Sequence, residues 1–327
     1  MRGEASTGRD LVENGVDERE KRARSLADAI AAIRGGDLGV TPLARLSDLS
    51  REGVKTLAAA WPSIPEETRE ALVRRCEELT EERVDLDFRR ALRVALDDAS
   101  PVVRQLAISA LWEDESRDLL ARLRGLFADD PSPDVRAAAA AALERFASQG
   151  ALGELDAGAT EDLRARLLAT ARDEHAAYGV RRRALEALGP FAADEEIAAA
   201  IADAYASEDH GLQCSAVYAM GRSHDARWLP AILEQLQGDE PELRFEAARA
   251  AGALGSSDAL PALLSAAGDD DAEVRHTAIG AIGQIGGRGA VRALERLADD
   301  AGEADLELIE AALDDANTLL EPFPDPS

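Results

Sequence analysis

Lysine, cysteine and long apolar runs are all scarce in this chain of 327 residues. Its two cysteines, Cys76 and Cys214, lie on different repeats and argue against a disulfide framework, which fits a reducing compartment. The first residues have no apolar stretch like that of a signal peptide. Nothing approaches the roughly 18 consecutive apolar residues that a membrane span needs. We therefore expect a cytoplasmic protein that does not engage membranes.

Basic residues are also scarce relative to acidic ones. The chain carries 64 acidic and 37 basic residues, for a formal net charge of −27, and only Lys21 and Lys55 are lysines. Such a charge disfavours nucleic acid as a partner. An acid excess with few lysines is typical of proteins adapted to molar salt, as in halophilic archaea, where the Debye length is only about 3 Å. A GC-rich genome also replaces lysine by arginine, but it does not explain the acid excess.

One short pattern recurs at intervals of roughly 30 residues, which is typical of stacked repeats. An acidic, often proline-containing turn leads into Val-Arg or Leu-Arg and a run of small residues, as in residues 129–146. Further copies lie at residues 98–104, 178–181, 239–244 and 269–275. In a degenerate copy at residues 209–215, Cys214-Ser215 stands in for Val-Arg. The glycine-containing insertion at residues 148–160 is predicted to be a loop.

Each copy predicts a helix preceded by a leucine-spaced partner helix. Proline and acids suit the first turn of a helix, and the apolar positions recur every three or four residues. Neither helix can bury its apolar stripe alone, so the stripes must be buried by stacking of neighbouring repeats. The arginine lies beside the buried face and can reach an acid at a turn of its own or the adjacent repeat. We expect this structural ladder at Arg104, Arg136, Arg181, Arg244 and Arg275.

The unit resembles a HEAT repeat of the short prokaryotic kind, most closely at residues 180–189 and 274–283. The resemblance implies an all-α fold, a right-handed α-α superhelix of about eight helix pairs. We expect it to span residues 42–320, after a disordered N-terminus at 1–16 and a capping helix within 17–41. Residues 321–327 are rich in proline and are expected to form a non-helical tail.

No constellation for chemistry stands out, so we expect no catalytic residue, no metal site and no cofactor. The histidines are taken as isolated surface or turn residues, with no His-x-x-x-His and no Cys-x-x-Cys. The His-Glu pairs of the iron-binding hydroxylase of the HEAT superfamily are missing. No Gly-x-Ser-x-Gly elbow or phosphate-binding loop occurs. DNA glycosylases built from HEAT-like repeats line their groove with basic residues. The net charge of this chain argues against such a groove.

What remains is the concave groove, which the second helix of each pair is expected to line. Positions one, five and eight after the ladder residue should point away from the core. Aromatic and arginine residues there are typical interface anchors. We therefore predict contact with a partner protein at Trp112, Arg182, Met220, Phe245, Arg249 and His276.

The leading hypothesis is a monomeric, non-catalytic scaffold that holds a partner protein in this groove. An alternative follows from the resemblance, since similar repeats occur in phycobilin lyase subunits and the groove could hold a tetrapyrrole. A regulatory module docked to signalling proteins is a further possibility. Gap-filling within the core is the competing role for Trp112 and Phe245.

Overall fold

The computed structural model describes residues 25–300 and 302–318, and throughout this part of the chain the regular structure is helical, with no strand. The described residues fall into two compact units: unit 1 comprises residues 25–142, and unit 2 comprises residues 143–300 and 302–318. The predicted disordered N-terminus (1–16) and C-terminal tail (321–327) lie outside the described residues. Residues 25–34 of the predicted capping segment are helical.

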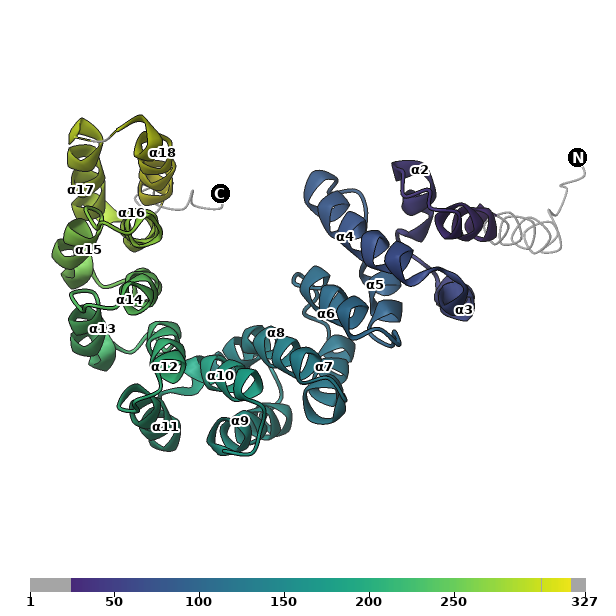
Figure 1. Cartoon of the computed structure of the whole chain (residues 1–327), viewed down its shortest axis with the longest axis horizontal. Helices are drawn as coiled ribbons and strands as arrows, with labels where there is room; N and C mark the ends of the chain where they lie inside the picture. Colours follow the sequence, from purple (N-terminus) through teal and green to yellow (C-terminus); the bar gives the residue numbers. More distant parts are fainter. Residues whose placement is uncertain (1–24, 301, 319–327) are drawn as a thin grey trace, which may run out of the picture. The chain divides into compact units, whose positions relative to one another are not determined.

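In unit 1, short helix α2 (Val40–Leu43) precedes two and a half helix pairs (Figure 1). Their helices are α3 (Arg51–Ala60), α4 (Glu66–Glu82), α5 (Arg89–Ala95), α6 (Pro101–Ala110) and α7 (Arg117–Asp129). Helix α8 (Pro133–Ala151) follows α7 in the chain, and the boundary between the two units falls within it. Within unit 1, α4 packs on α6 and α3 packs on α5, so first helices contact first helices and second helices contact second helices.

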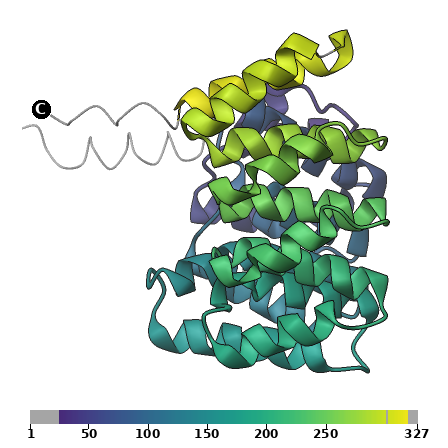
Figure 2. The same ribbon diagram turned by 90° about the vertical axis from the view of Figure 1, so that its left-hand side faces the viewer.

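Unit 2 continues the pairs with the same alternation. Its first helices are α9 (Ala157–Arg172), α11 (Glu195–Tyr205), α13 (Leu229–Gln235), α15 (Leu260–Ala266) and α17 (Gly287–Asp300). Its second helices are α10 (Tyr178–Ala187), α12 (His210–Arg222), α14 (Pro241–Leu254), α16 (Ala272–Ile285) and α18 (Glu303–Thr318). The second helices pack in succession, α10 on α12 and so on to α18. Figure 2 shows the teal-to-yellow helices of unit 2 stacked one on another. The chain is thus an α-solenoid, and α3 to α18 make eight consecutive pairs.

Local chemistry starts these helices where the repeat pattern predicts. Asp209 accepts a hydrogen bond from the Leu212 N–H at the start of α12, and Asp271 accepts from Glu273 and Val274 at the start of α16. Prolines open α6 and α14, where their missing N–H costs nothing. The caps satisfy N–H groups that have no partner within the helix.

Glycines near the ends of the second helices let neighbouring backbones touch. A Cβ built on Gly221 would lie 2.5 Å from the Cα of Ala250, and one on Gly252 would lie 2.9 Å from the Cα of Ala281. The same contact recurs one repeat earlier and one repeat later, at Gly189 against Ala219 and at Gly283 against Ala312. The register between successive second helices of unit 2 is therefore fixed by backbone contact.

In unit 1 the ladder is made by three arginines and two buried aspartates. Arg69 pairs with Asp98 at 2.6 Å, and Arg104 pairs with Asp130 at 2.7 Å. The backbone carbonyl of Asp98 accepts from Arg104, and that of Asp130 accepts from Arg136, both at 2.7 Å. Each aspartate therefore joins the arginine of the preceding repeat to the arginine of its own repeat.

Unit 2 repeats this arrangement around Asp269. The Asp269 carboxylate pairs with Arg244 at 2.7 Å, and its backbone carbonyl accepts from Arg275 at 2.8 Å. The Arg244 guanidinium is the main cause that holds the pKa of Asp269 below its ordinary value. At Arg181, by contrast, the Nε atom is buried and has no hydrogen-bond partner among the described residues.

Two local expectations are wrong. Residues 148–160 do not form one loop, because α8 continues to Ala151 and α9 begins at Ala157. Gly150 does not break α8 but serves close packing, since a Cβ there would lie 2.9 Å from Cγ2 of Thr160. The chain turns instead at Gly153, whose φ is +77°.

The second error concerns the degenerate repeat, where Gln213 rather than Ser215 takes the arginine position. Its side-chain Nε2 donates to the carbonyl of Ser207, six residues earlier, at 2.9 Å. Arg244 donates to the carbonyl six residues before it in the same way, at 3.1 Å. This shifts the predicted register of α12 by two residues.

Candidate functional site

The shifted register changes which α12 residues are exposed on the second helices. Met220 was expected on this surface but is fully buried, so it belongs to the core of unit 2. The same register places Cys214 and Tyr218 where α14 has Phe245 and Arg249. We define the second-helix face of unit 2 as the surface formed by Arg182, Tyr218, Phe245, Arg249, His276 and Gly280; Glu186 and Cys214 occupy equivalent positions but are buried.

The other predicted contact residues fall into two groups. Arg182, Phe245, Arg249 and His276 are all partly or largely exposed on this face. Trp112 is also exposed, with 53% of its surface accessible, but it follows α6 in unit 1. It is therefore described with that unit and not with the second-helix face.

A half-buried polar network centres on Glu144, near the start of unit 2. The Tyr218 hydroxyl donates to the Glu144 carboxylate at 2.6 Å, and Arg222 pairs with the same carboxylate at 2.5 Å. The Arg249 guanidinium lies over the Tyr218 ring, 4.3 Å from its centroid, in cation–π geometry. Burial first, and then the nearby Glu144 charge, raise the pKa of Tyr218.

A second part of the network joins α10 to α12. Arg182 Nε donates to the Ser215 hydroxyl at 2.9 Å, and that hydroxyl donates to buried Glu186 at 2.8 Å. Arg183 also pairs with Glu186 at 2.5 Å. On α14, Glu246 lies 3.3 Å from Arg249, and burial raises the pKa of this carboxyl.

These contacts hold arginine and aromatic side chains in defined positions on neighbouring helices. Four arginines face three glutamates here (Arg182, Arg183, Arg222 and Arg249 against Glu144, Glu186 and Glu246). The balance is reversed in the whole chain, in which acids greatly outnumber bases. This network is therefore less acidic than the chain as a whole.

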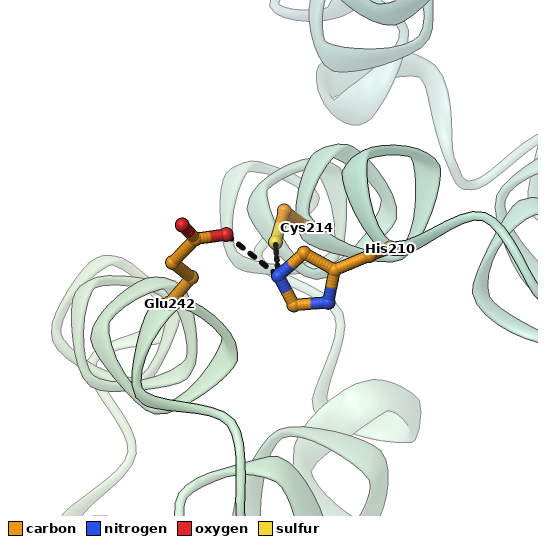
Figure 3. Close-up of side chains that lie close together, drawn as sticks. All are labelled: His210, Cys214 and Glu242. Atoms are coloured by element: carbon orange, nitrogen blue, oxygen red, sulfur yellow. Dashed lines mark hydrogen bonds and ion pairs between the residues drawn. The ribbon is translucent and has the colours of Figure 1, made fainter.

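A histidine, a cysteine and a glutamate meet at the edge of this face (Figure 3). His210 Nε2 lies 2.7 Å from Glu242 Oε2 and 3.8 Å from the Cys214 sulfur. All three potential ligand atoms lie within 4.8 Å of one another. Burial first, and then the Glu246 charge, raise the pKa of the Cys214 thiol to about 11.

The expectation that the histidines are isolated is wrong for His210. It lies four residues before Cys214, and a spacing of four residues places both side chains on one face of a helix. The His-x-x-x-Cys spacing was a usable signal in the sequence. Glu242 could not be assigned to the cluster from spacing, because it lies on α14, one repeat away.

HEAT repeats match residues 89–174 and 229–314, which together are more than half of the chain. The chain belongs to the HEAT-repeat family. No curated protein matches it significantly in sequence. Within the described residues, no helix of this HEAT-repeat protein is long and apolar enough to cross a membrane.

Solved structures of several proteins are similar to this HEAT-repeat chain. The CpcE–CpcF complex of phycocyanin lyase from Nostoc sp. PCC7120 has a TM-score of 0.52 and 21% identity, covering 82% of this chain and 95% of that one. YibA of E. coli has a TM-score of 0.42 and 17% identity, with coverages of 76% and 96%. Human deoxyhypusine hydroxylase has a TM-score of 0.35 and 18% identity, with coverages of 82% and 96%. The first similarity shows the fold alone, and the other two are too distant to support an argument.

Proposed function

We propose that this protein is a non-catalytic scaffold that binds a partner protein across the second-helix face of unit 2. The observation that carries the proposal is the group formed by Tyr218, Phe245 and Arg249, on neighbouring helices that contact each other directly. Tyrosine and arginine are enriched among the residues that dominate binding energies. HEAT-repeat solenoids commonly present such helix rows to proteins, and extended solenoid surfaces suit this role.

The preorganisation of these side chains supports binding. Tyr218 is held by Glu144 and by the guanidinium of Arg249, so fewer rotamers remain to be fixed on association. Ordering a free side chain at an interface costs about 0.5–1.5 kcal/mol. The close Gly–Ala contacts further limit movement of α12 against α14.

The local charge also favours a protein partner on this face. In a molecule of net charge −27, most of the surface repels acidic proteins, whereas Arg182 and Arg249 of this face offer charge-assisted hydrogen bonds. A partner that presents carboxylates together with apolar side chains fits both the arginines and Phe245. We further propose that the protein acts as a monomer in the cytoplasm.

The test compares two double variants of the tagged protein in capture from native lysate, read by mass spectrometry. Phe245→Ala/Arg249→Ala removes the anchors of the second-helix face. Arg166→Ala/Arg227→Ala removes two exposed arginines outside that face and serves as the matched control. Circular dichroism checks that both variants keep their helices.

We expect one protein to be enriched with the wild type and the control and lost with the anchor variant. Affinity of the purified pair should then fall at least about 100-fold in the anchor variant, since each hot-spot side chain contributes 2 kcal/mol or more. Equal capture by all three forms would contradict the assignment of the surface.

A further inference from the structure

The His210, Cys214 and Glu242 side chains stand apart from the other cross-repeat pairs of unit 2. His276 meets Asp305 at 3.0 Å on the following second helices, which is a comparable imidazole–carboxylate contact. Among the described residues, only the His210 pair has a thiol converging on the same ring nitrogen. We propose that these three side chains form a binding site for one divalent transition-metal ion of the zinc type.

The positions of the donors are set by the fold. His210 and Cys214 lie one turn apart on α12, and Glu242 lies in the first turn of α14. The backbone contact of Gly221 with Ala250 fixes α14 against α12. One ring nitrogen, Nε2, faces both the sulfur and the carboxylate, so it is the atom that would bind the ion.

The two separations from the His210 nitrogen fit a tetrahedral ion after a small movement. Zinc–nitrogen bonds of about 2.0–2.1 Å and zinc–sulfur bonds of about 2.3 Å place the two donors about 3.5 Å apart. The observed separation of Nε2 and sulfur is 3.8 Å. The carboxylate must move outward by roughly 0.7 Å from its 2.7 Å hydrogen bond to allow bonds of these lengths. It is free to do so, because 77% of the Glu242 side chain is exposed.

The donor types decide which ion fits. A thiolate and an imidazole favour zinc and similar ions over magnesium or calcium, which prefer oxygen ligands throughout. The ion displaces the thiol proton to the solvent, and the thiolate and carboxylate then balance its two positive charges. Three protein ligands leave a fourth position of a tetrahedral site for water or another ligand. The exposed edge formed by His210 and Glu242 gives access to that position.

The site differs from the partner surface in its chemistry and can be tested on the isolated protein. The full chain is freed of metal by chelation, kept reduced with a phosphine and titrated with Co²⁺, an optical substitute for zinc. We expect one Co²⁺ per chain, a sulfur-to-cobalt charge-transfer band in the near ultraviolet and visible bands typical of four-coordination. Zinc should displace the cobalt, whereas a large excess of Mg²⁺ or Ca²⁺ should not.

Single variants separate this site from adventitious binding. Cys214→Ser should abolish the charge-transfer band, and His210→Ala and Glu242→Gln should each weaken Co²⁺ affinity at least about 100-fold. Even the outer-shell partners of metal ligands typically matter 10- to 100-fold. Cys76→Ala removes the other thiol and His276→Ala removes the comparable His–Asp pair, so both should bind Co²⁺ like the wild type.

Three results would overturn the site. These are no stoichiometric uptake by the wild type, uptake without a sulfur band, and a sulfur band that persists in Cys214→Ser. Circular dichroism and thermal unfolding of each variant show whether a lost band reflects a lost ligand or a lost fold. Zinc should raise the unfolding temperature of the wild type but not that of folded Cys214→Ser, and an equal rise in both would also exclude the site.

Discussion

Gly221 and Ala250 are in contact through their backbones, because a Cβ added to Gly221 would lie 2.5 Å from the Cα of Ala250. The contact joins α12 to α14 and recurs at intervals of one repeat through Gly252 and Gly283. Real side chains essentially never approach a backbone so closely, so any larger residue must push the helices apart. The glycine therefore sets the spacing of the second helices.

Gly221→Ala should lower the free energy of unfolding by about 1–3 kcal/mol, which is typical of overpacking. Gly280→Ala is the matched control, because Gly280 also lies inside a helix but has no atom within 4 Å of an added Cβ. That change should stabilise the protein by about 0.5–1 kcal/mol through helix propensity. Denaturant midpoints compare the two variants, and similar shifts in the same direction would refute the packing argument.

The buried ladder predicts a different kind of mutational effect in unit 1. Only 9% of the Arg104 side chain and 3% of the Asp130 side chain are exposed. Arg104→Met keeps the aliphatic stem but leaves the Asp130 carboxylate buried without its counter-ion. We expect a loss of about 3–5 kcal/mol, measured by denaturant unfolding.

Two further variants control this prediction. Arg104→Met/Asp130→Asn removes both charges and should recover part of the lost stability. Lys55→Ala breaks the exposed pair with Glu52 and should have little measurable effect. If Arg104→Met behaved like Lys55→Ala, the ladder would not stabilise the stack.

The architecture was predictable because each repeat is specified by residues that lie close together in the sequence, and the same pattern recurs along the chain. The acid, the Val-Arg pair and the alanines of residues 129–146 specify a helix start, a buried face and a close approach, without distant contacts. The family match confirms the HEAT-repeat solenoid, as does the described part of the chain, in which all regular structure is helical. The same locality explains the failure in the degenerate repeat, where the arginine itself is replaced.

In that repeat the choice of Ser215 over Gln213 moved every inferred side chain of α12 around the helix. Two residues correspond to about 200° of rotation, which exchanges core for surface. Met220 is therefore a core residue, and Tyr218 takes the partly exposed position that the sequence analysis gives to Met220. The spacing of Gly189, Gly221, Gly252 and Gly283 would have given the correct register, since the glycine follows the ladder position by eight residues.

Side-chain contacts between different repeats could not be predicted from the sequence, for a different reason. Glu144 lies 74 residues before Tyr218 in sequence, and their hydrogen bond depends on how α8 and α12 approach. No local spacing encodes that approach. The partner-contact residues stay a prediction, because their exposure alone does not establish binding.

The Tyr218–Glu144 hydrogen bond predicts an alkaline titration. The chain has three tyrosines, and the pKa values of Tyr178, Tyr205 and Tyr218 are all raised, that of Tyr218 chiefly by burial. A raised pKa means that folding favours the neutral phenol, so this stabilisation is complete below about pH 10 and is lost as the pH rises further. Glu144→Gln removes the nearby negative charge and should lower the pKa of Tyr218.

Phenolate absorbance followed against pH tests this prediction. Tyr218→Phe should remove the last tyrosine to ionise in the wild type, and Glu144→Gln should move that step to lower pH. Tyr205→Phe is the control and should leave the last step in place. A last step unchanged in both Tyr218→Phe and Glu144→Gln would exclude the hydrogen bond as its cause.

The net charge of −27 predicts that potassium chloride stabilises the protein. Raising the salt from about 0.1 M to 1 M shortens the Debye length from about 10 Å to 3 Å, which screens repulsion between exposed carboxylates. The buried Arg104–Asp130 pair is screened much less, so its attraction should persist while the repulsion weakens. The midpoint of urea unfolding should therefore rise steadily across a potassium chloride series.

Potassium sulfate at equal ionic strength separates screening from the stronger exclusion of sulfate from protein surfaces. Equal stability at low and molar potassium chloride would refute both the repulsion and the proposed adaptation to molar salt.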